Sequence, residues 1–180
     1  AHDATGSPAS AALSGTAQDM TPPAAPAGLT AAAGNNQVSL SWTANTESNL
    51  SYYIIYRSAS SGFNPAPTDS IDRVNNPGTT FTNTGLTAGT YYFKIAAVDS
   101  SGNQSTASSQ VSATLAPAYS QSSSSLSFGT VNVGSTGTQT FTVSNMGTAA
   151  LAVSGISVSG TNAAQFTVSP KKIWLNPNPE

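Results

Sequence analysis

Alternation of apolar and polar side chains is the feature that most constrains the fold of this chain. Residues 37–42 read Gln-Val-Ser-Leu-Ser-Trp, which places Val38, Leu40 and Trp42 on one face of an extended strand. Further strands are predicted at residues 52–57, 79–83, 90–99 and 110–115, with turns rich in glycine, asparagine and proline between them. No window supports a helix of useful length. The chain is therefore predicted to be all-β.

Composition narrows the classes of partner. Only 7% of the 180 residues are charged and the net charge is -2, so no basic surface is expected and nucleic acid is not an expected partner. No apolar run approaches the roughly 20 residues that a membrane-spanning helix needs. The chain has no cysteine, which excludes a disulfide framework and thiolate metal sites. A chain of 180 residues can form two β-sandwiches of about 100 residues or fewer each.

Residues 21–116 carry a set of motifs that resembles a complete fibronectin type III domain. Its parts are a proline-rich start at Pro22–Leu29, a core tryptophan at Trp42, a third strand at Tyr53–Arg57 and a signature at Leu86–Asp99. The resemblance implies structural roles for Trp42, Leu86 and Tyr91, with Tyr91 forming a tyrosine corner by bonding back to upstream backbone. Tyr92 is the alternative for that role because the spacing from Leu86 is one residue short.

A second series of strands follows a serine-rich linker at residues 117–125. Strands are expected within residues 126–134, 138–144, 145–151, 152–158 and 165–168. The motifs are Phe128-Gly129, Val133-Gly134, Asn145-Met146-Gly147, Leu151 and the segment 159–166. Residues 126–180 thereby resemble the first half of the immunoglobulin-like domain of bacterial choice-of-anchor proteins and of the ASPM, SPD-2 and Hydin group. The predicted architecture is two tandem immunoglobulin-like β-sandwiches, the second incomplete.

The incompleteness of the second domain raises two alternatives. About 60 residues are available where a self-sufficient sandwich needs about 100. Either the chain is a fragment of a longer protein, or the half-sandwich leaves an open edge that another chain covers by adding a strand. Residues 1–20 have no packing pattern and are predicted to be unstructured or extended, so they could supply that strand in a head-to-tail filament.

No group of side chains predicts catalysis, a cofactor or a metal. His2, the single histidine, lies in an unpatterned segment where nothing would orient it as a base. Asp69 and Asp72 are expected in a loop, where they could bind calcium in principle, but turn formation is favoured because no third acidic ligand is near. Asp99 with Asn103 is expected to form an Asx-type turn. The chain is not predicted to be an enzyme.

Two surfaces are candidates for binding a ligand or partner. If Tyr53 and Ile55 face the core, alternation sends the neighbouring side chains outward to a surface that could stack on sugar rings or protein, or could stabilise the sheet alone. The members of this predicted outer tyrosine face are Tyr52, Ile54, Tyr56, Tyr92 and Lys94. The second candidate is Trp174 beside Lys171 and Lys172, with packing into the incomplete core as its alternative role.

The resulting prediction is a non-catalytic structural or adhesion module of a bacterial secreted or surface protein, serving as spacer or assembly subunit. The chain begins at Ala1 without methionine, as a mature secreted form or a recombinant product would, and an extracellular or cell-surface location is expected. Protein partners, or self-association through the second domain, are expected. One alternative is an accessory carbohydrate-binding region of a polysaccharide-degrading enzyme, with polysaccharide as partner. The other is a subunit of an extracellular filament assembled by strand complementation.

Overall fold

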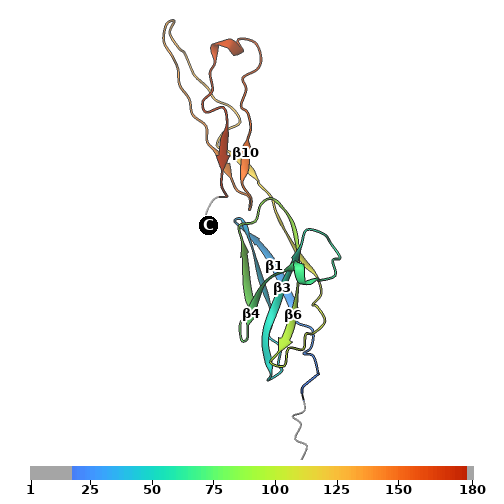
Figure 1. The fold of residues 1–180 in the computed structure, drawn as a ribbon. Helices are drawn as coiled ribbons and strands as arrows, with labels where there is room; N and C mark the ends of the chain where they lie inside the picture. The colour runs from blue at the N-terminus through green and yellow to red at the C-terminus, as the bar shows by residue number, and fades with distance from the viewer. Residues whose placement is uncertain (1–17, 178–180) are drawn as a thin grey trace, which may run out of the picture.

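The computed structural model describes residues 18–177, and the regular elements in this range are β-strands and two short 3-10 turns, η1 (Pro67–Asp69) and η2 (Ala163–Gln165). The prediction of an all-β chain is confirmed. The molecule is elongated (Figure 1), with strands β1 to β7 in one body and strands β8 to β11 in a second region beyond one end of that body. No helix among the described residues is long and apolar enough to cross a membrane.

The body is a sandwich of two antiparallel sheets. The first sheet has the order β1-β2-β5 and is made of β1 (Ala27–Gly34), β2 (Gln37–Thr43) and β5 (Thr80–Thr84). The second has the order β4-β3-β6-β7 and is made of β4 (Ser70–Asn75), β3 (Leu50–Ser58), β6 (Gly89–Asp99) and β7 (Val111–Leu115). Each sheet buries its inner face against the other, which is the usual solution for two amphipathic sheets.

The core forms where alternating side chains of the two sheets meet. Val38 and Leu40 on β2 are almost fully buried and face Tyr53, Ile55 and the inner side chains of β6, which are also fully buried. Trp42 packs edge-on against Tyr53, with 5.2 Å between ring centroids and 69° between ring planes. The period-two pattern of β2 therefore translates directly into the packed layer between the sheets.

Two strands of the body differ from the prediction. β1 occupies residues that the sequence presents as a proline-rich start followed by alanine and glycine, and it pairs with β2 despite its low β-propensity. β4 runs through a segment that was predicted to be a loop. Its register with β3 shifts between Ile55 and Tyr56, so the alternation of Ile71 and Val74 is interrupted and the strand is hidden in the sequence.

The second region is much thinner than the body. Two two-stranded sheets lie next to the body: β8 (Tyr119–Gln121) pairs with β9 (Val143–Asn145), and β10 (Leu151–Val153) pairs with β11 (Ile173–Leu175). Residues 122–142 and 154–172 extend from these sheets as two arms (Figure 1). The arms contact each other through Phe128 and Phe166, whose ring centroids are 5.7 Å apart.

The strands expected in the second region are mostly shorter than predicted. Residues 126–134, where the sequence predicts a strand, form none. Of the strand expected at 138–144, only the end is present, as the start of β9. The segment 152–158 is a strand only at its start in β10, and the segment 165–168 follows η2 without pairing. The serine-rich stretch 117–125 is not a free linker, because it contains β8. A strand is maintained by hydrogen bonds to a neighbour, and the arms have none along most of their length.

Candidate functional site

The junction between the body and the second region is tied by backbone hydrogen bonds. The connecting residues Ala116 and Ala118 pair with the loop that follows β9: Thr148 N donates to Ala116 O at 2.9 Å, and Met146 N donates to Ala118 O at 2.7 Å. The Thr148 hydroxyl also accepts from Ala116 N at 3.2 Å. We call residues 145–150 the junction loop. The backbone pairing of this loop with Ala116 and Ala118 resembles the pairing of two strands. The connection between the domains is therefore held by hydrogen bonds and is not a flexible linker.

Asn145 holds the junction loop from inside. Its side-chain amide donates to Ala149 O at 2.7 Å and to Leu175 O at 3.1 Å, and its Oδ1 accepts from Ala118 N at 3.3 Å and from Gly147 N at 3.0 Å. The residue is 3% exposed. One side chain thus joins the connecting segment, the junction loop and β11, and uses both its donor and its acceptor group.

The junction loop also contacts the body directly. Ala149 is fully buried and is a member of the core cluster of the first domain. Asn36, in the turn between β1 and β2, donates its N–H to Thr148 O at 2.9 Å, and its own carbonyl accepts from Leu86 N at 2.9 Å. A side chain at Gly147 would overlap the backbone of Ala116 and Ala118. The close approach of the junction loop to the connecting residues therefore requires glycine at position 147.

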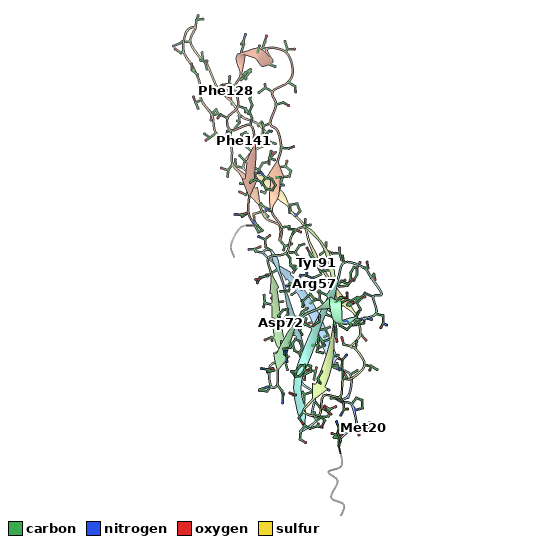
Figure 2. All side chains as sticks on the ribbon, in the orientation of Figure 1. Met20, Arg57, Asp72, Tyr91, Phe128 and Phe141 are labelled. Atoms are coloured by element: carbon green, nitrogen blue, oxygen red, sulfur yellow. The ribbon has the colours of Figure 1, made fainter. Side chains whose placement is uncertain are left out.

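The second region leaves apolar side chains half-exposed between its arms. A hollow of about 470 Å³ lies between the arms, and we call it the open trough. Val168, which is half-buried, lines it together with five more exposed apolar residues. These five are between 37% and 46% exposed and are Leu126, Phe128, Phe141, Val158 and Phe166. Figure 2 shows Phe128 and Phe141 in this region and Met20 at the opposite end of the molecule. The trough is the inner face of a sandwich that these residues alone do not close.

The predicted outer tyrosine face is largely covered. Tyr56 is only 5% exposed and its hydroxyl accepts from Gln104 Nε2 at 3.2 Å, so the prediction of an exposed Tyr56 is wrong. Lys94, its cross-strand neighbour, donates to Phe63 O at 2.9 Å and lies 5.4 Å from the Phe63 ring centroid. The physical reason is that two segments outside the strands cover this face: Gln104, between β6 and β7, contacts Tyr56, and Phe63, before β4, contacts Lys94. Alternation along β3 does not register such a cover.

The remaining members of that face are half-buried. The Arg73 guanidinium lies 5.2 Å from the centroid of the Tyr52 ring and occupies one side of it. Tyr52 and Ile54 line a hollow of about 340 Å³, with Asp72 and Arg73 among its other residues. Tyr92 is half-buried on the neighbouring strand. These residues are spread over three strands and do not form one aromatic platform.

Trp174 is the most exposed aromatic platform of the second region. It lies at the centre of β11, where Ile173 and Leu175 are half-buried and Trp174 is 78% exposed. The alternative role as a plug of the incomplete core is therefore wrong, because alternation along β11 directs the indole away from the neighbours of Ile173 and Leu175. Its cross-strand partner on β10 is Ala152, whose small side chain leaves space beside the indole.

The residues expected to have structural roles lie in the body. Trp42 and Leu86 are 6% exposed and belong to the core cluster. The Tyr91 hydroxyl donates to Thr87 O at 3.1 Å, which is the bond back to upstream backbone that a tyrosine corner makes, whereas Tyr92 lies on the other side of the strand. The Arg57 guanidinium lies 5.6 Å from the Tyr91 ring centroid.

The acidic residues act in turns. Asp69 accepts from Ala66 N at 2.9 Å in η1, and Asp72 lies in β4 rather than in a loop, so the two carboxylates do not form the loop pair that was expected. Among the described residues no group of three or more histidine, cysteine, aspartate or glutamate side chains is close enough to hold a metal. His2 lies outside the described residues.

Asp99 forms the Asx-type turn between β6 and β7. Its Oδ1 accepts from Ser101 N and Asn103 N, and its Oδ2 accepts from Asn103 Nδ2 at 2.9 Å. These donors, above all the Asn103 amide, lower the pKa of Asp99 below its usual range because they stabilise the charged form. Glu47 is affected similarly, since the Ala24 N–H donates to it and lowers its pKa.

Comparison with protein families assigns both parts of the chain. A model of the fibronectin type III domain matches residues 24–114, which is just over half of the chain. The chain belongs to the fibronectin type III family. A model described as a HYDIN/CFA65/VesB-like, Ig-like domain matches residues 117–180. The two resemblances expected from sequence motifs are confirmed, and the match of the Ig-like domain includes the serine-rich stretch that forms β8.

Similarity to a curated protein extends beyond the fibronectin type III domain. Exoglucanase B of Cellulomonas fimi is 34% identical to this chain over 141 residues, which is 75% of the chain. The chain spans 12% of the length of that relative.

Solved structures match about half of the chain. An Fn3-like protein from Clostridium thermocellum is 30% identical, with a TM-score of 0.43, over 51% of this chain and 92% of that one. A beta-1,2-glucanase from Parabacteroides distasonis is 26% identical, with a TM-score of 0.45, over 57% of this chain and 14% of that one.

Proposed function

We propose that this chain is a non-catalytic structural module of a bacterial secreted or surface protein, in which the fibronectin type III domain and the Ig-like domain act as a stiff spacer. Domains of both kinds are generally non-catalytic modules. The observation that carries the proposal is the junction, where Asn36 N donates to Thr148 O and Ala149 is buried in the core of the first domain. Asn145 holds the junction loop in place from within the Ig-like domain. A spacer needs a fixed angle between its domains, and a hydrogen-bonded junction with a buried residue supplies one.

The stiffness proposed for the two-domain chain depends on the junction, because bending between the domains would occur there. A flexible connection would leave the residues between the domains without partners, and the domains would then move independently. Here Ala116 and Ala118 are paired with the junction loop, and Ala149 is buried in the core of the first domain. Bending at this point would break these hydrogen bonds and expose Ala149 at the same time, which raises the free-energy cost of bending.

Small-angle X-ray scattering of the purified chain tests the spacer. A single elongated shape with the domain arrangement of Figure 1 is expected to fit the data at all protein concentrations. Data that require a mixture of straight and bent arrangements would reject the spacer function.

A second candidate function is that of an accessory region of a polysaccharide-degrading enzyme. The similarity to Exoglucanase B favours it, because the aligned residues cover 75% of this chain and thus extend past one domain. In this role the chain would hold a catalytic domain near an insoluble polymer or bind the polymer itself. As part of a secreted enzyme, the chain would also be extracellular.

Co-sedimentation with insoluble polysaccharides tests the accessory function. The chain is expected to be depleted from solution by at least one neutral polymer of a panel that includes cellulose, chitin and xylan. Absence of depletion from every polymer would reject carbohydrate binding and would leave the spacer function unaffected.

A third candidate function is that of a filament subunit, and the open trough favours it. An added strand would cover the half-exposed apolar residues of the trough and pair with the arms. The donor expected from the sequence is residues 1–20, of which 1–17 lie outside the described residues. Met20 lies at the end opposite the arms, which suits a head-to-tail contact between copies (Figure 2).

Light scattering on the full chain and on a variant without residues 1–17 tests the filament. The full chain is expected to elongate with concentration, and the shortened chain is not. A monodisperse monomer at high concentration would count against this function.

A further inference from the structure

A third hollow lies at the junction itself, next to Trp174. Its volume is about 440 Å³, and it is bounded by the turn between β1 and β2, the loop between β5 and β6, the end of the junction loop and β11. Asn36, Leu86 and Thr87 line it from the fibronectin type III domain, and Ala150 and Trp174 line it from the Ig-like domain. We call it the junction hollow. Ligand sites occur preferentially between domains, where two surfaces meet at an angle.

The indole of Trp174 is presented to this hollow by a fixed element. β11 pairs with β10 along its three residues, and the carbonyl of Leu175 accepts from the Asn145 amide at 3.1 Å. The side chain of Trp174 is 78% exposed, so its flat face is not used in packing. A rigid aromatic ring loses little conformational freedom when a ligand stacks on it, which makes it an efficient contact surface.

The polar groups of the junction hollow are neutral and held in place. The backbone of Asn36 is fixed on both sides, by its bond to Thr148 O and by the bond that it accepts from Leu86 N. No partner among the described residues is recorded for its side-chain amide, which is therefore free to donate and accept. The Thr87 hydroxyl lies 3.5 Å from the Tyr91 hydroxyl. Among residues 18–177, no charged side chain lines the hollow.

This combination selects the chemistry of the ligand. An uncharged lining disfavours phosphate, carboxylate and ammonium groups, which would lose hydration without gaining an ion pair. A flat apolar surface beside an amide and a hydroxyl suits a ring that has one apolar face and hydroxyl groups around its edge. A pyranose ring of a neutral polysaccharide has this form. The hollow beside Tyr52 is less suitable, because Arg73 already covers that ring.

We propose that Trp174 and the junction hollow bind a pyranose ring of a neutral polysaccharide, with the ring stacked on the indole and its hydroxyl groups bonded to Asn36 and Thr87. The inference rests on the accessory carbohydrate-binding function and names its site. Because the hollow includes residues of both domains, binding requires the junction to be formed.

Tryptophan fluorescence of the whole chain gives a direct test. The chain has two tryptophans, and Trp42 is buried in the core, so quenching by acrylamide reports mainly on Trp174. Soluble oligosaccharides of glucose, N-acetylglucosamine and xylose are the probes. One of them is expected to reduce the quenching of Trp174 at least twofold and to shift its emission to shorter wavelength. Unchanged quenching with all three probes would overturn the proposal.

Variants locate the site. Trp174→Ala is expected to reduce retention on the matching insoluble polymer at least tenfold, and Asn36→Ala several-fold, whereas Tyr52→Ala on the outer face retains wild-type binding. The remaining emission of Trp42 shows that Trp174→Ala is folded. Retention that Trp174→Ala leaves unchanged would overturn this site while the accessory function stands. Absence of retention for the wild-type chain would overturn both. Concentration-dependent protection of Trp174 without sugar would show a second copy in the hollow and also overturn the proposal.

Discussion

Replacing Asn145 with alanine removes four hydrogen bonds from the junction at once. The amide donates to Ala149 O and Leu175 O, and its oxygen accepts from Ala118 N and Gly147 N. Because Asn145 is 3% exposed and Ala149 is fully buried, water does not easily replace these partners. All four partners lie in the Ig-like domain, so the variant is expected to loosen the junction loop. The contacts that Thr148 and Ala149 of this loop make with the first domain are weakened with it.

The expected free-energy loss follows from the two carbonyl groups that lose a hydrogen-bond donor. The carbonyls of Ala149 and Leu175 are left without the Asn145 amide, and a buried polar group without a partner costs about 1–3 kcal/mol. The N–H groups of Ala118 and Gly147 lie nearer to solvent and are counted as neutral. The closed form of the junction loop is thus expected to lose about 2–6 kcal/mol, which corresponds to about a 30- to 25,000-fold change in its opening equilibrium.

Amide hydrogen exchange resolved by residue measures this opening. Asn36 N donates from the first domain to Thr148 O, and Met146 N and Thr148 N donate from the junction loop to the connecting residues. The exchange of these three N–H groups in Asn145→Ala is expected to accelerate by that factor. Trp42 N, which donates to Thr79 O inside the body, is expected to keep its rate.

Two further variants sharpen the result. Asn145→Asp keeps the acceptor and loses the donor, and it is expected to open the junction at least as much as alanine does. Met146→Ala changes an exposed neighbour and is expected to have no effect. If the exchange rates of Asn36 and Thr148 stay at their wild-type values in Asn145→Ala, the role assigned to Asn145 is refuted.

Three further variants test other parts of the account. Gly147→Ala places a side chain against the backbone of the connecting residues and is expected to cost about 1–3 kcal/mol, seen as a lower urea midpoint. Asp99→Asn is expected to make stability less dependent on acid. Because folding lowers the pKa of Asp99, its contribution is present above the unfolded value of about 3.9 and is lost as pH falls through the folded value, so urea unfolding between about pH 2 and pH 5 checks the shallower slope. Tyr91→Phe removes the 3.1 Å bond to Thr87 O and is expected to lower stability by about 0.5–1.5 kcal/mol, measured by thermal unfolding. Equal acid sensitivity of wild type and Asp99→Asn, or an unchanged melting temperature in Tyr91→Phe, would refute the role given to that residue.

The body was largely predictable because its strands alternate regularly. Val38, Leu40 and Trp42 define the inner face of β2, and the same periodicity identified β3 and β6. β1 was missed because alanine and glycine are poor indicators of a strand, and β4 because a register shift interrupts its pattern. These strands form through pairing with strong neighbours, which local sequence does not show.

The junction could not be predicted from sequence. Asn145, Gly147 and Ala149 read as a glycine turn inside a series of strands, and only the folded structure shows that this turn packs on the first domain. A signal was present in the combination of one asparagine with small residues, but many turns share it. Trp174 was recognised as a candidate, whereas its exposure depends on the register of β11 with β10. Tyr56 shows the reverse case, in which Gln104, between β6 and β7, contacts a position that alternation places outside.

The central claim is that the junction fixes the two domains in one arrangement, and a distance measurement between them tests it most directly. The chain has no cysteine, so Ser101→Cys in the body and Ser154→Cys beyond β10 provide two unique positions for spin labels. Both serines are exposed. Pulsed electron paramagnetic resonance is predicted to give a single narrow distance distribution that broadens when Asn145→Ala is added. A broad distribution in the chain with native Asn145 would contradict the account.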